Sequence, residues 1–102
     1  MTYTLRFLPQ VEADVWNGRV WYEDKSPGLG EEFLRVFYAS SEEIARNPQI
    51  YATFHKDFRR RLLRRFPYAI YFRIEHEYVV VFGLFHCARD PRRLRQELRD
   101  RQ

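Results

Sequence analysis

Residues 58–93 read FRRRLLRRFPYAIYFRIEHEYVVVFGLFHCARDPRR, and this stretch decides the fold. It contains two runs rich in β-branched and aromatic residues, Tyr68–Ile74 and Tyr78–Phe85, which a polar loop of three residues separates. That pattern indicates a β-hairpin. The second run is apolar on both faces, which is typical of a central strand. Strict alternation along it places one set of residues on a single face: Val79, Val81, Gly83, Phe85 and Cys87.

The chain outside the hairpin supplies the remaining elements. Tyr3–Leu8 alternates up to a proline and is expected to be a strand. Phe58–Phe66 is a strand by context, and Pro48–Asp57 is expected to be a loop. The apolar residues expected to be tucked inward from this loop are Ile50, Tyr51 and Phe54. Apolar spacing and capping residues predict three helices: Gln10–Asp24, Leu29–Arg46 and Arg92–Arg99.

These elements give the order β-α-α-β-β-β-α, an α+β fold in which a helical hairpin packs on one face of the sheet. A chain of 102 residues, 45% of them hydrophobic, predicts a single domain over residues 1–102. The start of the sequence lacks the pattern of a signal peptide, and no apolar run approaches the roughly 20 residues that span a bilayer. We therefore expect a cytoplasmic protein that does not enter a membrane.

Cysteine and histidine usage argues against a metal centre. Cys87 is the only cysteine, so no intrachain disulfide can form, and we expect it to be a small core residue. The three histidines, His55, His76 and His86, are scattered, and none has a second ligand at helical spacing. We expect neither a metal nor a cofactor.

The charge is unevenly distributed along the chain. Residues 1–58 hold six Lys and Arg against nine Asp and Glu, a net charge of −3, whereas residues 59–102 hold twelve against five, a net charge of +7. Two arginine clusters flank the hairpin: Arg59, Arg60, Arg61, Arg64 and Arg65, then Arg89, Arg92, Arg93, Arg95 and Arg99. Guanidinium groups bind phosphate or carboxylate in a bidentate fork. The pattern predicts an anionic partner, either nucleic acid or an acidic peptide, although a solvated charged face explains each cluster singly.

One constellation could carry chemistry, at the end of the last strand. His86 can exchange a proton near neutral pH, and Arg89 can stabilise charge on a phosphorane. With Tyr71 and Arg73 from the adjacent strand, they would suit metal-independent RNA cleavage. A structural interpretation is also open, with His86 as a hydrogen-bonded residue at a strand end and Tyr71 as a cross-strand packing residue.

Several segments together resemble the RelE/ParE superfamily of toxins from bacterial type II toxin–antitoxin systems. They are the turn before the second helix, SPGLGEEFL (residues 26–34), the segment RFPYAIY (65–71), the strand Val79–Phe85, and His86 followed by Arg89-Asp90-Pro91. The ParE-like branch fits best. The resemblance implies a curled, mostly antiparallel sheet, a cognate antitoxin partner and a toxin–antitoxin hetero-oligomer. Residues expected to contact the antitoxin or the target are Arg61, Arg65, Tyr71, Arg73, Arg89, Arg92 and Arg93.

Targets diverge within the superfamily, since ParE-like members inhibit DNA gyrase whereas RelE-like members cut mRNA in the ribosome. Arg89 falls where RelE-like nucleases carry an arginine, but Ala69 replaces their other strand arginine. Arg95 lies near the position of their C-terminal tyrosine, and Arg60 and Leu62 at that of a basic pair. The nuclease set is mostly absent, so the sequence favours a gyrase inhibitor. The alternative is a ribosome-dependent endonuclease that uses His86 and Arg89.

Overall fold

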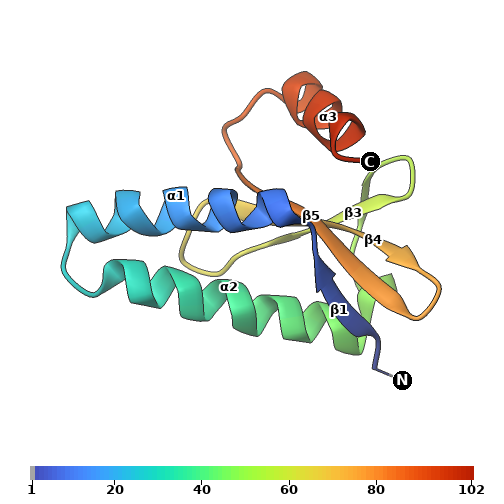
Figure 1. Cartoon of the computed structure of the whole chain (residues 1–102), viewed down its shortest axis with the longest axis horizontal. Coiled ribbons are helices and arrows are strands. Elements are labelled where there is room, and N and C mark those ends of the chain that lie inside the picture. Colours follow the sequence, from blue (N-terminus) through green and yellow to red (C-terminus); the bar gives the residue numbers. More distant parts are fainter. Residues whose placement is uncertain (1) are drawn as a thin grey trace.

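The computed structural model describes residues 2–102 and contains one five-stranded sheet, ordered β1-β5-β4-β3-β2 (Figure 1). The elements are β1 (Thr4–Phe7), α1 (Pro9–Lys25), α2 (Leu29–Arg46), a 3-10 turn (Pro48–Ile50), β2 (Thr53–His55), β3 (Phe58–Leu62), β4 (Tyr68–Glu75), β5 (Tyr78–His86) and α3 (Pro91–Asp100). β1 pairs parallel with β5, and the other neighbours are antiparallel. The α+β class, the β4–β5 hairpin and the interior position of β5 are confirmed.

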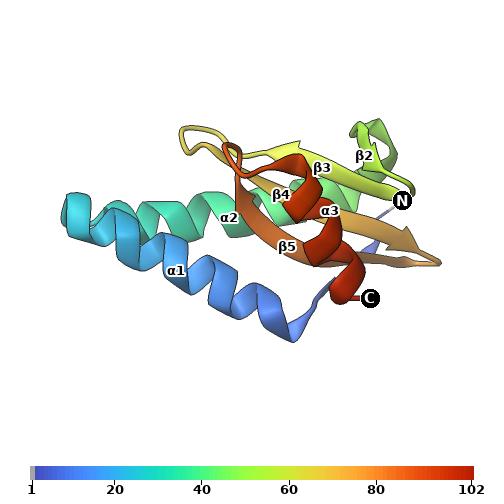
Figure 2. The same ribbon diagram turned by 90° about the horizontal axis from the view of Figure 1, so that it is seen from above.

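The sheet separates two apolar clusters, and different helices cover its two faces. α1 and α2 form an antiparallel hairpin (Figure 1) and pack, with Phe33, Phe37 and Ile44, against one face. α3 lies apart from that hairpin (Figure 2) and places Leu94 and Leu98 against the other face. A sheet buried on both sides explains why β5 is apolar throughout.

A β-bulge in β5 corrects the predicted alternation. Tyr71 of β4 lies opposite Gly83, but Phe72 lies opposite Val81, so Phe82 is an extra residue in β5. Beyond it the faces exchange: Leu84 packs with the helical-hairpin cluster, and Phe85 packs with α3. The prediction that Phe85 shares a face with Val79 and Val81 is therefore wrong. The predicted core position of Cys87 is wrong too, because this residue follows the strand end and is exposed.

The segment between α2 and β4 also differs from the expectation. The predicted loop 48–57 contains the 3-10 turn and a fifth strand, β2, which is only three residues long and too short to show a periodic pattern. Ile50, expected to be inward, is 67% exposed. β3 ends at Leu62 instead of continuing to residue 66, so Leu62 is exposed while Leu63 turns into the core.

An ion pair from distant parts of the chain closes the bulge. Leu84 donates its backbone N–H to Asp14 Oδ2 at 3.1 Å, and Arg101 donates to the Phe82 carbonyl at 2.8 Å. The same two side chains pair with each other at 2.6 and 3.0 Å. They satisfy backbone groups that the bulge leaves without a strand partner. Within residues 2–102, no helix is long and apolar enough to cross a bilayer.

Candidate functional site

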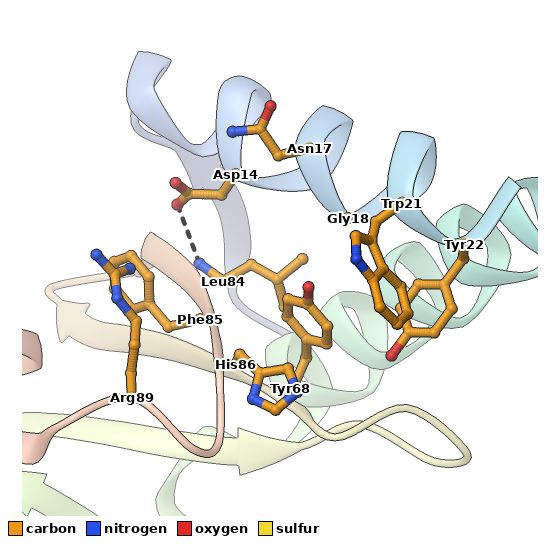
Figure 3. A pocket seen from close by; sticks show the side chains of 10 residues that line it. All are labelled: Asp14, Asn17, Gly18, Trp21, Tyr22, Tyr68, Leu84, Phe85, His86 and Arg89. Carbon is orange, nitrogen blue, oxygen red and sulfur yellow. Dashed lines mark hydrogen bonds between the residues drawn. The ribbon is translucent and has the colours of Figure 1, made fainter. Parts of the chain in front are cut away.

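A hollow of about 450 Å³ lies between α1 and the ends of β4 and β5 (Figure 3). Its lining residues are Asp14, Asn17, Gly18, Trp21, Tyr22, Tyr68, Leu84, Phe85, His86 and Arg89. The structure thus brings the two candidate catalytic residues, His86 and Arg89, to one concave surface. The residues from α1 were not expected there, because the packing of a helix over a strand end leaves no local signal in the sequence.

Aromatic rings form the wall of the hollow. The Tyr68 ring meets His86 edge-on at 5.1 Å between centroids, and the Tyr22 ring lies 4.9 Å from Trp21. Burial raises the pKa of both Tyr22 and Tyr68, so both phenols stay protonated at neutral pH. Gly18 lets the Phe33 ring approach, since a Cβ there would lie 2.5 Å from a ring atom.

The hydrogen bonds of His86 define what its imidazole can do. Its Nδ1 accepts a hydrogen bond from the Ala88 backbone N–H at 3.0 Å. In the neutral ring the proton therefore lies on Nε2, so this nitrogen can donate a hydrogen bond to a ligand in the hollow. The Arg89 guanidinium lies 4.8 Å over the Phe85 ring and 3.7 Å from Glu97.

Three of the residues predicted to contact a partner are buried or largely covered by other parts of the chain. Arg61 is 11% exposed, donates to the Ser40 carbonyl and pairs with Glu43 at 2.7 Å. Arg73 is 20% exposed and is neutralised by Glu75. Tyr71 is fully buried between the sheet and α3, and its hydroxyl has no hydrogen-bond partner. Tyr71 is therefore closed to a partner, whereas Arg61 and Arg73 keep a small exposed part and are held by the protein's own carboxylates. Sequence alone could not show this, because the covering groups come from α2, α3 and the end of β4.

The other four predicted contact residues lie at the surface. Arg65 is 60% exposed and lies 3.6 Å from Glu32, and Arg92 pairs with Asp90 while remaining 83% exposed. Arg89 is also exposed, as is Arg93. The two arginine clusters therefore do not form one continuous basic surface, since internal carboxylates neutralise part of each.

An exposed apolar surface lies on the helical hairpin and the adjoining end of β1. Trp16 is 55% exposed and Tyr38 is 51% exposed, with Phe7 and Val20 close behind. A groove of about 340 Å³ runs between the two helices, and its apolar lining residues are Phe7, Leu8, Pro9, Val11, Val15, Trp16, Leu34, Phe37 and Tyr38. α1 has apolar residues around most of its circumference, but only one of its faces packs against the sheet. This distribution was the sequence signal that another apolar face of α1 has no partner within the fold.

Among the described residues, no group of three His, Cys, Asp or Glu side chains could hold a metal ion. The absence of a cofactor stays a prediction.

No protein-family model matches the chain. It is 26% identical over 102 residues to "Toxin ParE2" of Mycobacterium tuberculosis, in both the CDC 1551 and H37Rv strains, covering 99% of this chain and 97% of the relative. This full-length similarity supports the resemblance to the RelE/ParE superfamily. The fold also matches solved structures. One is of the chromosomal ParDE toxin–antitoxin system of P. aeruginosa, with TM-score 0.69, 14% identity, and coverage of 83% of this chain and 96% of that one.

A second similar structure comes from the toxin–antitoxin complex RelBE2 of M. tuberculosis, with TM-score 0.57, 21% identity, and coverage of 84% of this chain and 99% of that one. At these identities the structures show the fold. The fold and the full-length similarity to ParE2 toxins agree with the resemblance to ParE-like toxins of type II toxin–antitoxin systems. Both structures are of toxin–antitoxin systems or complexes, as their descriptions state.

Proposed function

We propose that this RelE/ParE protein is a cytoplasmic toxin that inhibits DNA gyrase and that a cognate antitoxin holds it inactive in a hetero-oligomer. The full-length similarity to ParE2 toxins carries the proposal. Ala69 occupies the strand position at which RelE-like nucleases carry an arginine. It is completely buried and can contact no substrate, which supports the proposal of a gyrase inhibitor.

Purified gyrase tests the target. Relaxed plasmid is incubated with gyrase, ATP and a titration of the toxin, and supercoiling is followed on gels. We expect inhibition at low micromolar toxin, and recovery when the protein encoded by the adjacent reading frame is added first. Full supercoiling at a large molar excess of folded toxin would remove gyrase as the target.

The antitoxin is expected to dock on the helical hairpin. Trp16 and Tyr38 are large, rigid aromatic side chains beside a groove, and such residues dominate the affinity of protein interfaces. A segment that folds on binding could lay apolar side chains into this groove. The surface arginines Arg65, Arg89, Arg92 and Arg93 would then contact acidic residues of the antitoxin or of the target.

Paired substitutions test this docking site. Trp16→Glu with Tyr38→Glu should weaken binding of the antitoxin by about a hundredfold or more, because two aromatic anchors are lost and two carboxylates are introduced. Ile50→Glu with Leu62→Glu is the matched control, since it makes the same change at two exposed apolar residues away from the hairpin. Equal losses in the two variants would contradict the assignment.

A second candidate function follows from the hollow. His86 Nε2–H can donate a hydrogen bond to a phosphate oxygen, Arg89 supplies positive charge, and the exposed Trp21 offers a ring on which a base could stack. This arrangement favours metal-independent cleavage of mRNA in the ribosome. His86→Ala or Arg89→Ala should abolish cleavage in a translating extract, with His76→Asn in the β4–β5 turn as the control. Undiminished cutting by the first two variants would reject the nuclease role.

A further inference from the structure

The two flanks of α3 differ in how their charges are neutralised. On one flank Glu97 and Arg101, one turn apart, face other charged groups of the protein. Glu97 lies 3.7 Å from Arg89, and Arg101 pairs with Asp14 at 2.6 Å. This flank is closed by internal ion pairs.

The opposite flank carries Arg95 and Arg99, also one helical turn apart. Leu94 and Leu98 point into the sheet and separate the two flanks. In the described part of the chain, neither Arg95 nor Arg99 has a carboxylate within 4.0 Å; Arg99 donates only to the Gln96 amide oxygen. Neither guanidinium group is closed by an ion pair, although Arg95 is near enough to help lower the pKa of Asp90.

The turn between β2 and β3 lies beside α3 (Figure 1). Phe54 and Phe58, on either side of the turn, pack in the same cluster as the leucines of α3. Arg73 connects the two regions, because it contacts Gln102 after α3 at 2.8 Å and Asp57 of the turn at 4.0 Å. Asp57 is thus directed toward Arg73.

His55 and Lys56 bring two further basic groups to the same place. Lys56 occupies the turn with φ 53° and has no carboxylate within 4.0 Å among residues 2–102. Desolvation lowers the pKa of His55, and the charges of Lys56, Arg95 and Arg99 lower it further. These four residues, which we call the cationic corner, therefore lie close enough for their charges to interact.

We propose that the cationic corner binds the phosphodiester backbone of a nucleic acid. Arg95 and Arg99 donate in forks to phosphate oxygens, Lys56 adds a point charge, and His55 donates a further hydrogen bond. Arg60 lies 5.4 Å over the Phe54 ring and extends the basic surface along β3. This inference concerns a surface outside the hollow and does not depend on which cellular target the toxin has.

The composition of the corner favours phosphate over an acidic peptide. Arg95, Arg99 and Lys56 are donors only, and phosphate contacts of this kind need no apolar anchor. A peptide that folds on binding needs apolar anchors, and the exposed aromatic residues Phe7, Trp16 and Tyr38 lie on β1 and the helical hairpin, on the other side of the sheet.

Fluorescence anisotropy with labelled 20-mers tests the proposal, with one arm of duplex DNA and one of single-stranded RNA. Arg95→Gln with Arg99→Gln should weaken binding of at least one of them tenfold or more. The slope of log affinity against log salt for duplex DNA should also fall by about 2, because each lost phosphate contact removes about one released counterion. Arg35→Gln with Arg46→Gln on α2 is the control with the same change in net charge, and it should alter affinity less than twofold.

The pKa of the His55 imidazole is a second measurement, and a general loss of positive charge in a variant does not account for its change on binding. A bound phosphodiester neutralises the surrounding cations, so the pKa of His55 followed by NMR should rise when the oligonucleotide is added. The proposal would be overturned if the two double variants weakened binding equally or if the salt slope did not change. Competition by poly-glutamate at the same charge concentration would also overturn it and would assign the corner to an acidic peptide. Circular dichroism and thermal melting check that each variant is folded.

Discussion

Asp14 and Arg101 stand 87 positions apart in the sequence, yet they act as one unit on the bulge of β5. Each is nearly buried, each bonds a backbone group that the bulge leaves open, and each neutralises the other. Neither sequence pattern nor spacing indicates such a pair, because Asp14 looks like an ordinary charged position on a helix and Arg101 like one just after a helix. Removal of one partner leaves a desolvated charge and an unpaired backbone group.

Asp14→Asn or Arg101→Gln should each lower the free energy of unfolding by about 2–4 kcal/mol. Urea denaturation measures the change, and the double variant should cost less than the sum of the single ones, because the two side chains are coupled. Arg19→Gln, which breaks the exposed pair with Glu31, is the control and should cost less than about 1 kcal/mol. Strictly additive losses in the double variant would argue against the coupled unit.

For Gly18→Ala, the sequence and the structure predict opposite changes in stability. Helix propensity alone predicts that Gly18→Ala stabilises α1 by about 1 kcal/mol. The structure predicts the opposite, a loss of about 1–3 kcal/mol, because the new Cβ would lie 2.5 Å from the Phe33 ring in the core. Thermal melting distinguishes the two, and a higher melting temperature would show that Phe33 can move aside.

At the scale of elements, the sequence predicted the helices and strands whose signals lie within a single segment. α2 matches its predicted bounds, and β4 and β5 extend one residue beyond theirs, because apolar periodicity and the turn residues lie within each segment. The three-residue β2, the bulge at Phe82 and the end of β3 at Leu62 were missed, since each depends on pairing with another strand. For the same reason the sequence placed His86 and Arg89 together but not Trp21 or Tyr22 beside them.

The turn between α1 and α2 should be sensitive to acid. The Glu23 carboxylate accepts hydrogen bonds from the Gly28 and Gly30 backbone N–H groups at 3.0 and 2.9 Å, and these bonds lower the pKa of Glu23. Its contribution is therefore present above the ordinary pKa of a glutamate and is lost as the pH falls through the lower folded-state value.

Denaturation curves collected across the acidic range check this dependence. Glu23→Gln should be less stable than the native protein at neutral pH, and the difference should shrink as the pH falls below about 4.5. Glu12→Gln, in the first turn of the same helix, is the comparison. A difference that stays constant with pH would mean that the carboxylate bonds do not contribute to the turn.

At the scale of the whole molecule, the exposed surface is divided by the sheet. Large exposed aromatic residues lie on β1 and the helical hairpin, whereas the cationic corner lies at α3 and the β2–β3 turn. The sequence located the basic half of the chain correctly but could not separate arginines held by internal carboxylates, such as Arg61 and Arg73, from those left free. Protein and anion are thus expected to bind on different sides of the molecule.

Amide hydrogen exchange of the toxin with and without its antitoxin tests this division most directly. The account predicts slower exchange in α1 and α2 around Trp16 and Tyr38, together with reduced labelling of those side chains in a parallel oxidative footprint. It predicts little change in β3 and α3 around Arg61 and Arg99. Protection confined to β3, β4 and α3, with exchange in α1 and α2 unchanged, would contradict this division. It would assign the antitoxin to the surface around the arginines of β3, β4 and α3.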